Sequence, residues 1–330
     1  MRCINKKQRH KRKSRLPFFL LFLVCIIGLG FFWKQNQVSV LAYETKVYGD
    51  TIYEEPLRID TLCVASGNVS WNDFQTKDKF HASALFQIDD TKVVYADKIH
   101  EKLYPASTTK ILTAYLALKY GNLDDVVTVS ENAVNIPLDS SKAGLRTGDK
   151  LTLEALLYSL MLPSGNDSAV AVAEHISGDV KTFVTLMNEE AKKLGATNSN
   201  FINPHGYHDE NHYTTAYDLY LIFNECIKYD KFLEIVSSAT YKTNITQKNG
   251  TYREASWNQS NQYINGAREI PKNIDVIGGK TGTTDEAGAC LILYSKANDH
   301  PYISIIMGAD LRNILYDNMT NLISSTLVLE

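Results

Sequence analysis

Residues 104–121 read YPASTTKILTAYLALKYG, where a proline precedes a small polar cluster and then an apolar repeat. Pro105 suits the first turn of a helix, in which its missing N–H costs nothing, and Gly121 is typical of a helix end. Between them apolar side chains recur at helical spacing: Ile111, Leu112, Tyr115 and Leu116. We therefore predict a helix that opens at Pro105 and carries both Ser107 and Lys110 near its start.

Ser107 and Lys110 lie three residues apart, so on a helix their side chains share one face, with Cβ atoms about 5–6 Å apart. A serine hydroxyl is a weak nucleophile until a base removes its proton, and a desolvated lysine amine can be that base. Free N–H groups in the first helical turn favour a developing oxyanion. The pattern S-x-x-K occurs once in the chain. We interpret it as catalytic, against the alternative of a chance pair on a helix.

A second motif, Ser164-Gly165-Asn166, is weak by itself because S-x-N recurs at Ser66, Ser70, Ser130 and Ser256. Its context is a tight Pro-Ser-Gly turn between two predicted apolar helices, one starting after the N-cap Thr152 and one spanning 167–177. Such a turn holds side chains rigidly. Ser164 could then relay a proton and Asn166 could donate to a substrate carbonyl. The alternative is an ordinary interhelical turn with Ser164 as N-cap.

The third motif is Lys280-Thr281-Gly282, flanked by Gly278-Gly279 and Thr283-Thr284. Glycines beside a strand allow a ligand to approach the backbone closely. A lysine and neighbouring hydroxyls suit the binding of a carboxylate. The alternative is a glycine-rich turn with a solvated lysine.

The remaining pattern places strands at both ends of the body and helices between them. Residues 83–88 and 92–95 predict a β-hairpin, and residues 181–194 and 215–229 predict further helices. Strands are expected at 274–279, 289–294 and 302–307. This order predicts an α/β (α+β) fold in which a mainly antiparallel sheet is flanked by helices, with an inserted helical lobe.

The N-terminal region has the features of an export or anchoring segment. The first fifteen residues hold eight Lys or Arg and no acid, and residues 16–33 form an uncharged apolar run. This run is near the lower limit for a membrane span and long for a signal-peptide core. A cleaved signal peptide, with Val40-Leu41-Ala42 as the cleavage site, and a retained anchor therefore both stay open. The basic flank keeps the N-terminus cytoplasmic, so we expect the body outside the cell membrane.

We accordingly expect four regions: a basic cytoplasmic tail (1–15), a signal peptide or membrane anchor (16–33), a stalk (34–78) and a catalytic domain (79–330). Composition supports a globular body, with 44% hydrophobic and 22% charged residues. With the basic tail set aside the body is acidic, which argues against a nucleic-acid partner, because phosphate binding requires clustered Lys and Arg.

Cysteines and histidines give no sign of a disulfide framework or a metal site. Cys63, Cys226 and Cys290 are scattered without a C-x-x-C pair, so we expect buried free thiols. His205, His208 and His212 lie close together in the sequence, but no H-E-x-x-H or thiolate pattern accompanies them. We interpret this segment as a polar loop and expect neither a metal nor a cofactor.

With the three motifs in this order, the sequence resembles the low-molecular-mass penicillin-binding proteins, the serine D-alanyl-D-alanine carboxypeptidases of peptidase family S11. The resemblance runs from about residue 80 to 320 and includes further blocks: Leu186-Met187-Asn188, Leu194-Gly195-Ala196, Asn203-Pro204-His205-Gly206 and Ala287-Gly288-Ala289-Cys290. It implies a fold like that of β-lactamases and transpeptidases. The sequence departs from the family at Tyr207, where leucine is usual, and no role is assigned to His205.

The resemblance implies that Ser107 attacks the D-Ala-D-Ala carbonyl of a peptidoglycan stem peptide, with Lys110 as base and Ser164 as a further catalytic residue. The N–H groups of Ser107 and Thr283 would form the oxyanion hole. Substrate binding would involve Asn166, Lys280, Thr281, Gly282 and Thr283. Penicillins and other β-lactams would acylate Ser107 as substrate mimics.

Two other functions remain as alternatives at this point. A β-lactamase shares the fold and motifs, but it needs a fast deacylation route, and no E-x-x-L-N follows the second motif. A non-enzymatic β-lactam sensor would acylate and stop, and it would need a signalling membrane domain. Endopeptidase or transpeptidase side activity, the physiological substrate and the oligomeric state stay open.

Overall fold

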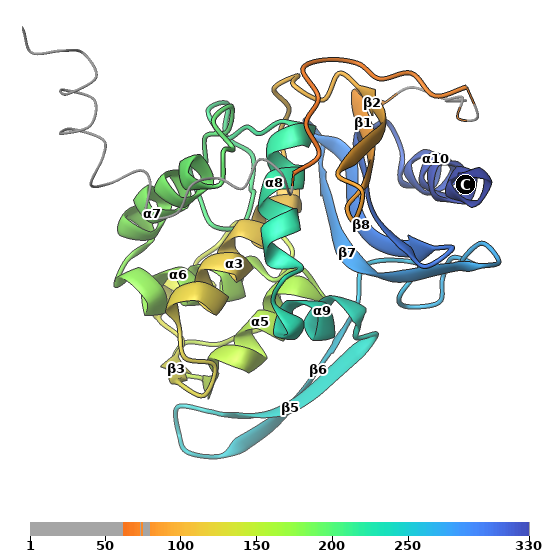
Figure 1. Cartoon of the computed structure of the whole chain (residues 1–330). Helices are drawn as coiled ribbons and strands as arrows, with labels where there is room; N and C mark the ends of the chain where they lie inside the picture. The colour runs from red at the N-terminus through yellow and green to blue at the C-terminus, as the bar shows by residue number, and fades with distance from the viewer. Residues whose placement is uncertain (1–61, 73, 75–79, 330) are drawn as a thin grey trace, which may run out of the picture. The chain divides into compact units, whose positions relative to one another are not determined.

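The computed structural model describes residues 62–72, 74 and 80–329. Its main sheet has five antiparallel strands in the order β2-β1-β9-β8-β7 (Figure 1). The strands are β1 (Ala82–Gln87), β2 (Lys92–Asp97), β7 (Ile274–Thr284), β8 (Gly288–Ala297) and β9 (His300–Ala309). The predicted hairpin and the three predicted C-terminal strands are confirmed, and the two ends of the domain share one sheet.

This sheet is buried on both faces, which is why all six residues of β1 are buried. On one face Phe86 stacks on Tyr220 of helix α8 (Ala216–Cys226), with ring centroids 4.1 Å apart. On the other face helix α10 (Arg312–Ser325) packs Tyr316 and Met319 into a second apolar cluster. Figure 1 shows α10 and the helical lobe on opposite sides of the sheet.

The helical lobe is centred on α3 (Lys110–Tyr120), whose first eight residues are all buried. A short 3-10 turn, η2 (Ala106–Thr109), precedes it, so Ser107 lies in this tighter turn and the α-helix begins at Lys110. Around α3 lie α4 (Glu131–Val134), α5 (Leu153–Met161), α6 (Asn166–Ser177), α7 (Val180–Lys193), α8 and α9 (Asp230–Ser237). Thr152 caps α5 by accepting a hydrogen bond from Ala155 N at 3.1 Å, as predicted.

A second, four-stranded sheet at the edge of the lobe was not predicted. Its order is β3-β4-β5-β6, with β3 (Val126–Thr128), β4 (Lys150–Thr152), β5 (Thr240–Thr246) and β6 (Tyr252–Asn258). Tyr241 of β5 stacks between Tyr158 of α5, at 3.7 Å, and Trp257 of β6, at 6.2 Å. These aromatic contacts fasten the polar hairpin to the lobe.

The described part of the expected stalk packs on the main domain. Cys63 is fully buried and its N–H donates to the Tyr220 hydroxyl at 2.9 Å. Val69 forms an antiparallel bridge with Ala96, and Phe74 is buried. The described residues between 62 and 74 thus contact the domain, and the boundary at residue 79 stays a prediction.

Cys63, Cys226 and Cys290 are buried and free, which confirms the predicted thiols. The apolar run at 16–33 and the basic tail lie outside the described residues. Among the helices that the structure describes, none has the length and hydrophobicity needed to span a bilayer.

Candidate active site

Lys110 lies at the centre of the candidate site and is fully buried. Its Nζ is within hydrogen-bond distance of three acceptors: Ser107 Oγ (2.9 Å), Asn166 Oδ1 (2.7 Å) and the His205 carbonyl oxygen (2.7 Å). Burial holds the pKa of Lys110 well below the usual lysine value, the positive charge of Lys280 lowers it further, and Asp167 opposes both effects. The amine is therefore placed and tuned to exchange a proton with the Ser107 hydroxyl.

The loop that contains His205 and Gly206 packs under the turn that carries the serine. Gly206 has φ +83°, and a Cβ at this position would lie 1.8 Å from the Ala106 carbonyl oxygen. Thr113 Oγ1 donates to the Pro204 carbonyl at 2.6 Å, which fixes the loop to α3. This close packing directs the His205 carbonyl at Lys110. The sequence block was recognised, but a contribution made by a backbone carbonyl has no signature in side-chain identity.

We expect Gly206→Ala to destabilise the fold by about 2–4 kcal/mol and to slow acylation, because the new methyl group must displace Ala106 or the His205 carbonyl. Thermal unfolding and the rate of penicillin labelling would measure the two effects. Gly266→Ala is the matched control, since Gly266 also has positive φ (+77°) but nothing lies within 4 Å of the position that a Cβ would take there. Equal effects of the two substitutions would contradict the role given to close packing.

Ser164 and Asn166 line the wall opposite Ser107. Ser164 is buried with φ +65°, an uncommon conformation for a serine, and its Oγ accepts a hydrogen bond from Lys280 Nζ at 3.0 Å. Asn166 is the first residue of α6, and its N–H donates to the Ser141 carbonyl at 2.9 Å. The N-cap of α6 is Gly165, so the alternative of Ser164 as a simple N-cap is wrong.

Lys280 lies within strand β7 and is 1% exposed, so the alternative of a solvated lysine in a turn is also wrong. Burial lowers the pKa of Lys280 to about 7, and the charge of Arg312 contributes in the same direction. A Cβ on Gly282 would lie 2.9 Å from the Pro105 carbonyl and 3.0 Å from Ser107 N. Glycine is therefore required here for β7 to pass beside the serine turn.

Two of the three threonines of this strand, Thr281 and Thr283, flank Gly282, which lies against the same turn. Thr281 Oγ1 lies 2.8 Å from Ser260 Oγ, and Thr283 Oγ1 donates to the Gly282 carbonyl at 2.7 Å. Thr283 is exposed and Thr281 is half-buried. The structure thus brings the predicted residues of all three motifs together around Ser107.

Sequence reasoning missed Arg312, the first residue of α10. Its side chain is exposed, yet its charge is close enough to lower the pKa of Lys280. Two positive charges therefore contribute to the electrostatic potential beside β7, which favours an anionic ligand. Because α10 itself was not predicted, nothing in the sequence placed Arg312 near the third motif.

The three neighbouring histidines hold a loop together. His212 Nε2 lies 2.9 Å from Thr109 Oγ1, and its Nδ1 accepts from Ile202 N at 3.1 Å. Burial lowers the pKa of His212 to about 4 and that of His205 to about 3. His208 packs edge-on against Tyr104, with centroids 4.7 Å apart. His212, which is buried, and His205, which is half-buried, are therefore neutral at neutral pH and act as packing groups.

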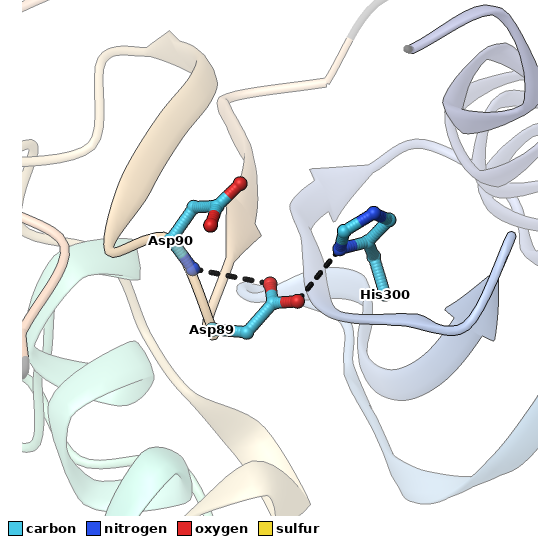
Figure 2. Close-up of side chains that lie close together, drawn as sticks. All are labelled: Asp89, Asp90 and His300. Carbon is cyan, nitrogen blue, oxygen red and sulfur yellow. Dashed lines mark hydrogen bonds and ion pairs between the residues drawn. The ribbon is translucent and has the colours of Figure 1, made fainter.

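A separate group of ligand-type side chains lies at the tips of two hairpins of the main sheet. Figure 2 shows Asp89 and Asp90 after β1, with Asp89 pointing at His300, the first residue of β9. The Asp89 carboxylate and His300 Nδ1 are 2.6 Å apart, and this hydrogen bond raises the pKa of His300. All three side chains have ligand atoms within 4.8 Å of one another. They share no residue with the site around Ser107.

A model of the D-alanyl-D-alanine carboxypeptidase family, peptidase S11, matches residues 73–311. The chain belongs to this family. It is 35% identical over 236 residues to the D-alanyl-D-alanine carboxypeptidase DacF of Bacillus subtilis, covering 69% of this chain and 57% of that protein. It is 38% identical over 216 residues to DacA of Haemophilus influenzae, covering 63% and 51%.

The fold agrees with this S11 membership. The solved structure of the Streptomyces K15 DD-transpeptidase superposes with a TM-score of 0.71 at 27% identity, covering 77% of this chain and 100% of that one. The predicted fold class is therefore confirmed. The chain spans about half the length of the two curated relatives, 57% and 51%.

Proposed function

We propose that this chain is an extracytoplasmic serine D,D-carboxypeptidase that removes the terminal D-Ala from peptidoglycan stem pentapeptides. The observation that carries the proposal is the buried Lys110 amine, 2.9 Å from Ser107 Oγ and with a lowered pKa. A neutral amine at this distance can take the hydroxyl proton as the oxygen attacks a carbonyl. The names of the relatives support the same reaction and give no support to the β-lactamase or sensor alternatives.

In the acylation step, Ser107 Oγ attacks the carbonyl carbon of the penultimate D-Ala, and its proton passes to Lys110 Nζ. The N–H groups of Ser107 and Thr283 would stabilise the negative oxygen of the tetrahedral intermediate. The peptide C–N bond then breaks, and the leaving amine of the terminal D-Ala requires a proton. Ser164 can deliver it, because its hydroxyl contacts Lys280 Nζ and can be reprotonated from there.

Between the two steps, Lys110 releases the proton that it took from Ser107 and Lys280 regains the proton that it supplied through Ser164, so the Lys110 amine is neutral again. In the deacylation step, water attacks the acyl ester and Lys110 takes a proton from it. The C–O bond to Ser107 breaks, and the serine regains its proton from the same amine. The trimmed peptide leaves with a new carboxylate. A β-lactam would follow the first half of this path, with the opened ring left attached to Ser107.

We assign recognition of the terminal carboxylate to Lys280, Thr281 and Thr283, assisted by Arg312. Lys280 has a pKa of about 7 in the free site. An arriving carboxylate would stabilise its ammonium form, so binding of substrate would also charge the proton relay at Ser164. Asn166 accepts from Lys110 through Oδ1, which leaves its amide N–H groups to donate to the peptide.

We expect Arg312→Gln to raise KM for a D-Ala-D-Ala peptide by about 10-fold with a smaller change in kcat, because a charge-assisted contact to a carboxylate contributes about 1.5–3 kcal/mol when desolvated and less at an exposed site. Steady-state D-Ala release measures both constants. Arg268→Gln is the control, because Arg268 also lies beside α10 but is paired with Asp317. An unchanged KM for Arg312→Gln would remove Arg312 from the binding site.

For the remainder of the chain we propose that residues 16–33 direct export, as a cleaved signal or as an anchor with a cytoplasmic tail at 1–15. The proposed reaction on peptidoglycan stem peptides requires the domain to act outside the cytoplasm. Membrane attachment can be tested by fractionation and by N-terminal sequencing of the mature protein. A new N-terminus after Ala42 would favour cleavage.

The proposed activity is tested by D-alanine release from diacetyl-Lys-D-Ala-D-Ala by the exported part of the chain, residues 43–330. Intact mass after incubation with benzylpenicillin should show one added penicilloyl group, and peptide mapping should place it in residues 104–110. D-Ala release together with this adduct supports a D,D-carboxypeptidase. An adduct that hydrolyses within seconds, without D-Ala release, would instead support a β-lactamase.

A further inference from the structure

Asp167 is a buried carboxylate that the reaction described above does not use. It follows Asn166 on α6 and is 2% exposed. Its two oxygens accept four backbone hydrogen bonds, from the N–H groups of Ala143 (2.8 Å), Gly144 (3.0 Å), Leu145 (3.0 Å) and Ser168 (3.0 Å). A carboxyl group that only accepts is in its ionised form. A negative charge is therefore held beside the candidate active site.

These hydrogen bonds fasten the loop of residues 141–145 to the wall that carries Asn166. The same loop accepts from Asn166 N through the Ser141 carbonyl, at 2.9 Å, and from Trp257 Nε1 through the Ala143 carbonyl, at 2.9 Å. Gly165 completes the contact, because a Cβ there would lie 2.8 Å from Asp167 Oδ1. The position of the Asn166 amide, and so of its contact with Lys110, depends on this bracing.

Among the four buried carboxylates, two have a basic partner, whereas Asp167 and Asp218 have none in direct contact in the described part of the chain. Asp149 pairs with Arg253, and Glu190 pairs with Lys119 and Lys193. Within the described part of the chain, Asp167 has no basic partner in direct contact. The negative charge of Asp167 acts on Lys110 and raises the pKa of the Lys110 amine.

The other titratable groups that face Lys110 act in the opposite direction. Lys280 on β7 lowers the pKa of Lys110. His205 and His212, on the loop beneath the serine turn, have pKa values of about 3 and 4 and are neutral at neutral pH. Of the two charged groups that shift the pKa of Lys110, Lys280 is positive and Asp167 is negative.

We propose that Asp167 is a positioning residue for acyl transfer, which fixes the 141–145 loop beside Asn166 and stabilises the ammonium that forms when Lys110 takes the Ser107 proton. This role rests on the serine mechanism proposed above. The carboxylate makes no contact with substrate in this role and acts through Asn166 and Lys110.

The test is the pH dependence of acylation by a fluorescent penicillin, measured for the 43–330 fragment and its Asp167→Asn variant. Acylation needs neutral Lys110, so the rate rises with pH through the pKa of Lys110. Without the negative charge Lys110 loses its proton at lower pH. In the plot of acylation rate against pH, we expect the rising part at low pH, the acid limb, to lie about one pH unit lower for Asp167→Asn than for the wild type. We expect the maximum rate at higher pH, the plateau, to fall about 10-fold, because the amine becomes a weaker base.

Trp257→Phe is the matched control, because it removes one hydrogen bond from the same loop without changing the charge. Its acid limb should coincide with that of the wild type. An Asp167→Asn limb that also coincides with the wild type would overturn the electrostatic role and leave only bracing. If Asp167→Asn does not fold, Asp167→Glu decides, since it keeps the charge and disturbs the loop. A wild-type limb with a lower plateau supports the proposal, and a limb displaced by a full unit contradicts it.

Failure of the serine mechanism would look different. In that case the wild-type fragment would not be labelled at any pH, and the role of Asp167 would fall with it. Labelling of the wild type with an unshifted Asp167→Asn limb overturns the role of Asp167 alone.

Discussion

Ser107→Ala should abolish both D-Ala release and penicillin labelling, with a loss of at least about 10⁴-fold in kcat/KM. The reason is that the covalent intermediate forms on Ser107 Oγ, and the described hydroxyls nearby are already engaged elsewhere: Ser164 with Lys280, and Thr109 with Ala106 and His212. Stopped assays of peptide hydrolysis and intact-mass measurement after exposure to benzylpenicillin report the two losses independently.

The substitution should leave the fold intact. Ser107 is half-buried and its hydroxyl accepts one hydrogen bond, from Lys110 Nζ, so the loss of that hydrogen bond costs about 1 kcal/mol or less. A Ser164→Ala variant provides a comparison, since it should slow proton delivery but still accumulate a penicilloyl adduct. Retained labelling of Ser107→Ala would show that another residue is the nucleophile.

The sequence could predict those elements whose own residues show, by their apolar spacing, that the element is buried. The helix after Pro105 is an example. Residues 110–117 are all buried, and the apolar side chains among them recur at helical spacing in the sequence. The three motifs were likewise visible, since each depends on side chains of particular chemistry. The resemblance to the family implied that the three motifs meet in one site. It did not predict the hydrogen bonds that connect Lys110 with Ser107 and Asn166, and Lys280 with Ser164.

Strand β7 shows where local rules failed. The predicted strand ends at residue 279, and glycine is unfavourable in strand interiors. In the structure the strand continues to Thr284, and the glycines serve tertiary packing. A Cβ at Gly278 would lie 2.6 Å from the Val236 side chain, and one at Gly282 would meet Pro105. That requirement arises from segments distant in sequence and cannot be read locally.

The missed elements share a polar composition or a dependence on distant partners. Helix α10 has polar residues through most of its length, and its apolar stripe gains meaning only against β8 and β9. The described residues between 62 and 74 have the sequence pattern of a stalk, because their partners are distant in sequence. For example, the Cys63 N–H donates a hydrogen bond to the hydroxyl of Tyr220, 157 residues away. Arg312 and the His205 carbonyl were missed for the same reason.

Lys110→Ala should slow acylation by about 10³- to 10⁴-fold while the protein remains folded. Lys110 is the described amine that lies within 3 Å of Ser107 Oγ, and its lowered pKa makes it a base near neutral pH. Lys110→Arg should be equally slow, because a guanidinium stays protonated and cannot accept the serine proton. This pair of variants separates loss of the base from loss of volume.

Lys119→Ala is the matched control, since Lys119 lies on the same helix and pairs with Glu190 away from the serine. It should alter thermal stability without changing the acylation rate. Small alkylamines added to Lys110→Ala should restore part of the rate if they enter the space that the side chain leaves, and the restored rate should increase with pH as the added amine becomes neutral. An acylation rate for Lys110→Ala equal to that of the wild type would refute Lys110 as the base and transfer that role to Lys280, whose pKa of about 7 makes it the other amine in the site able to accept a proton.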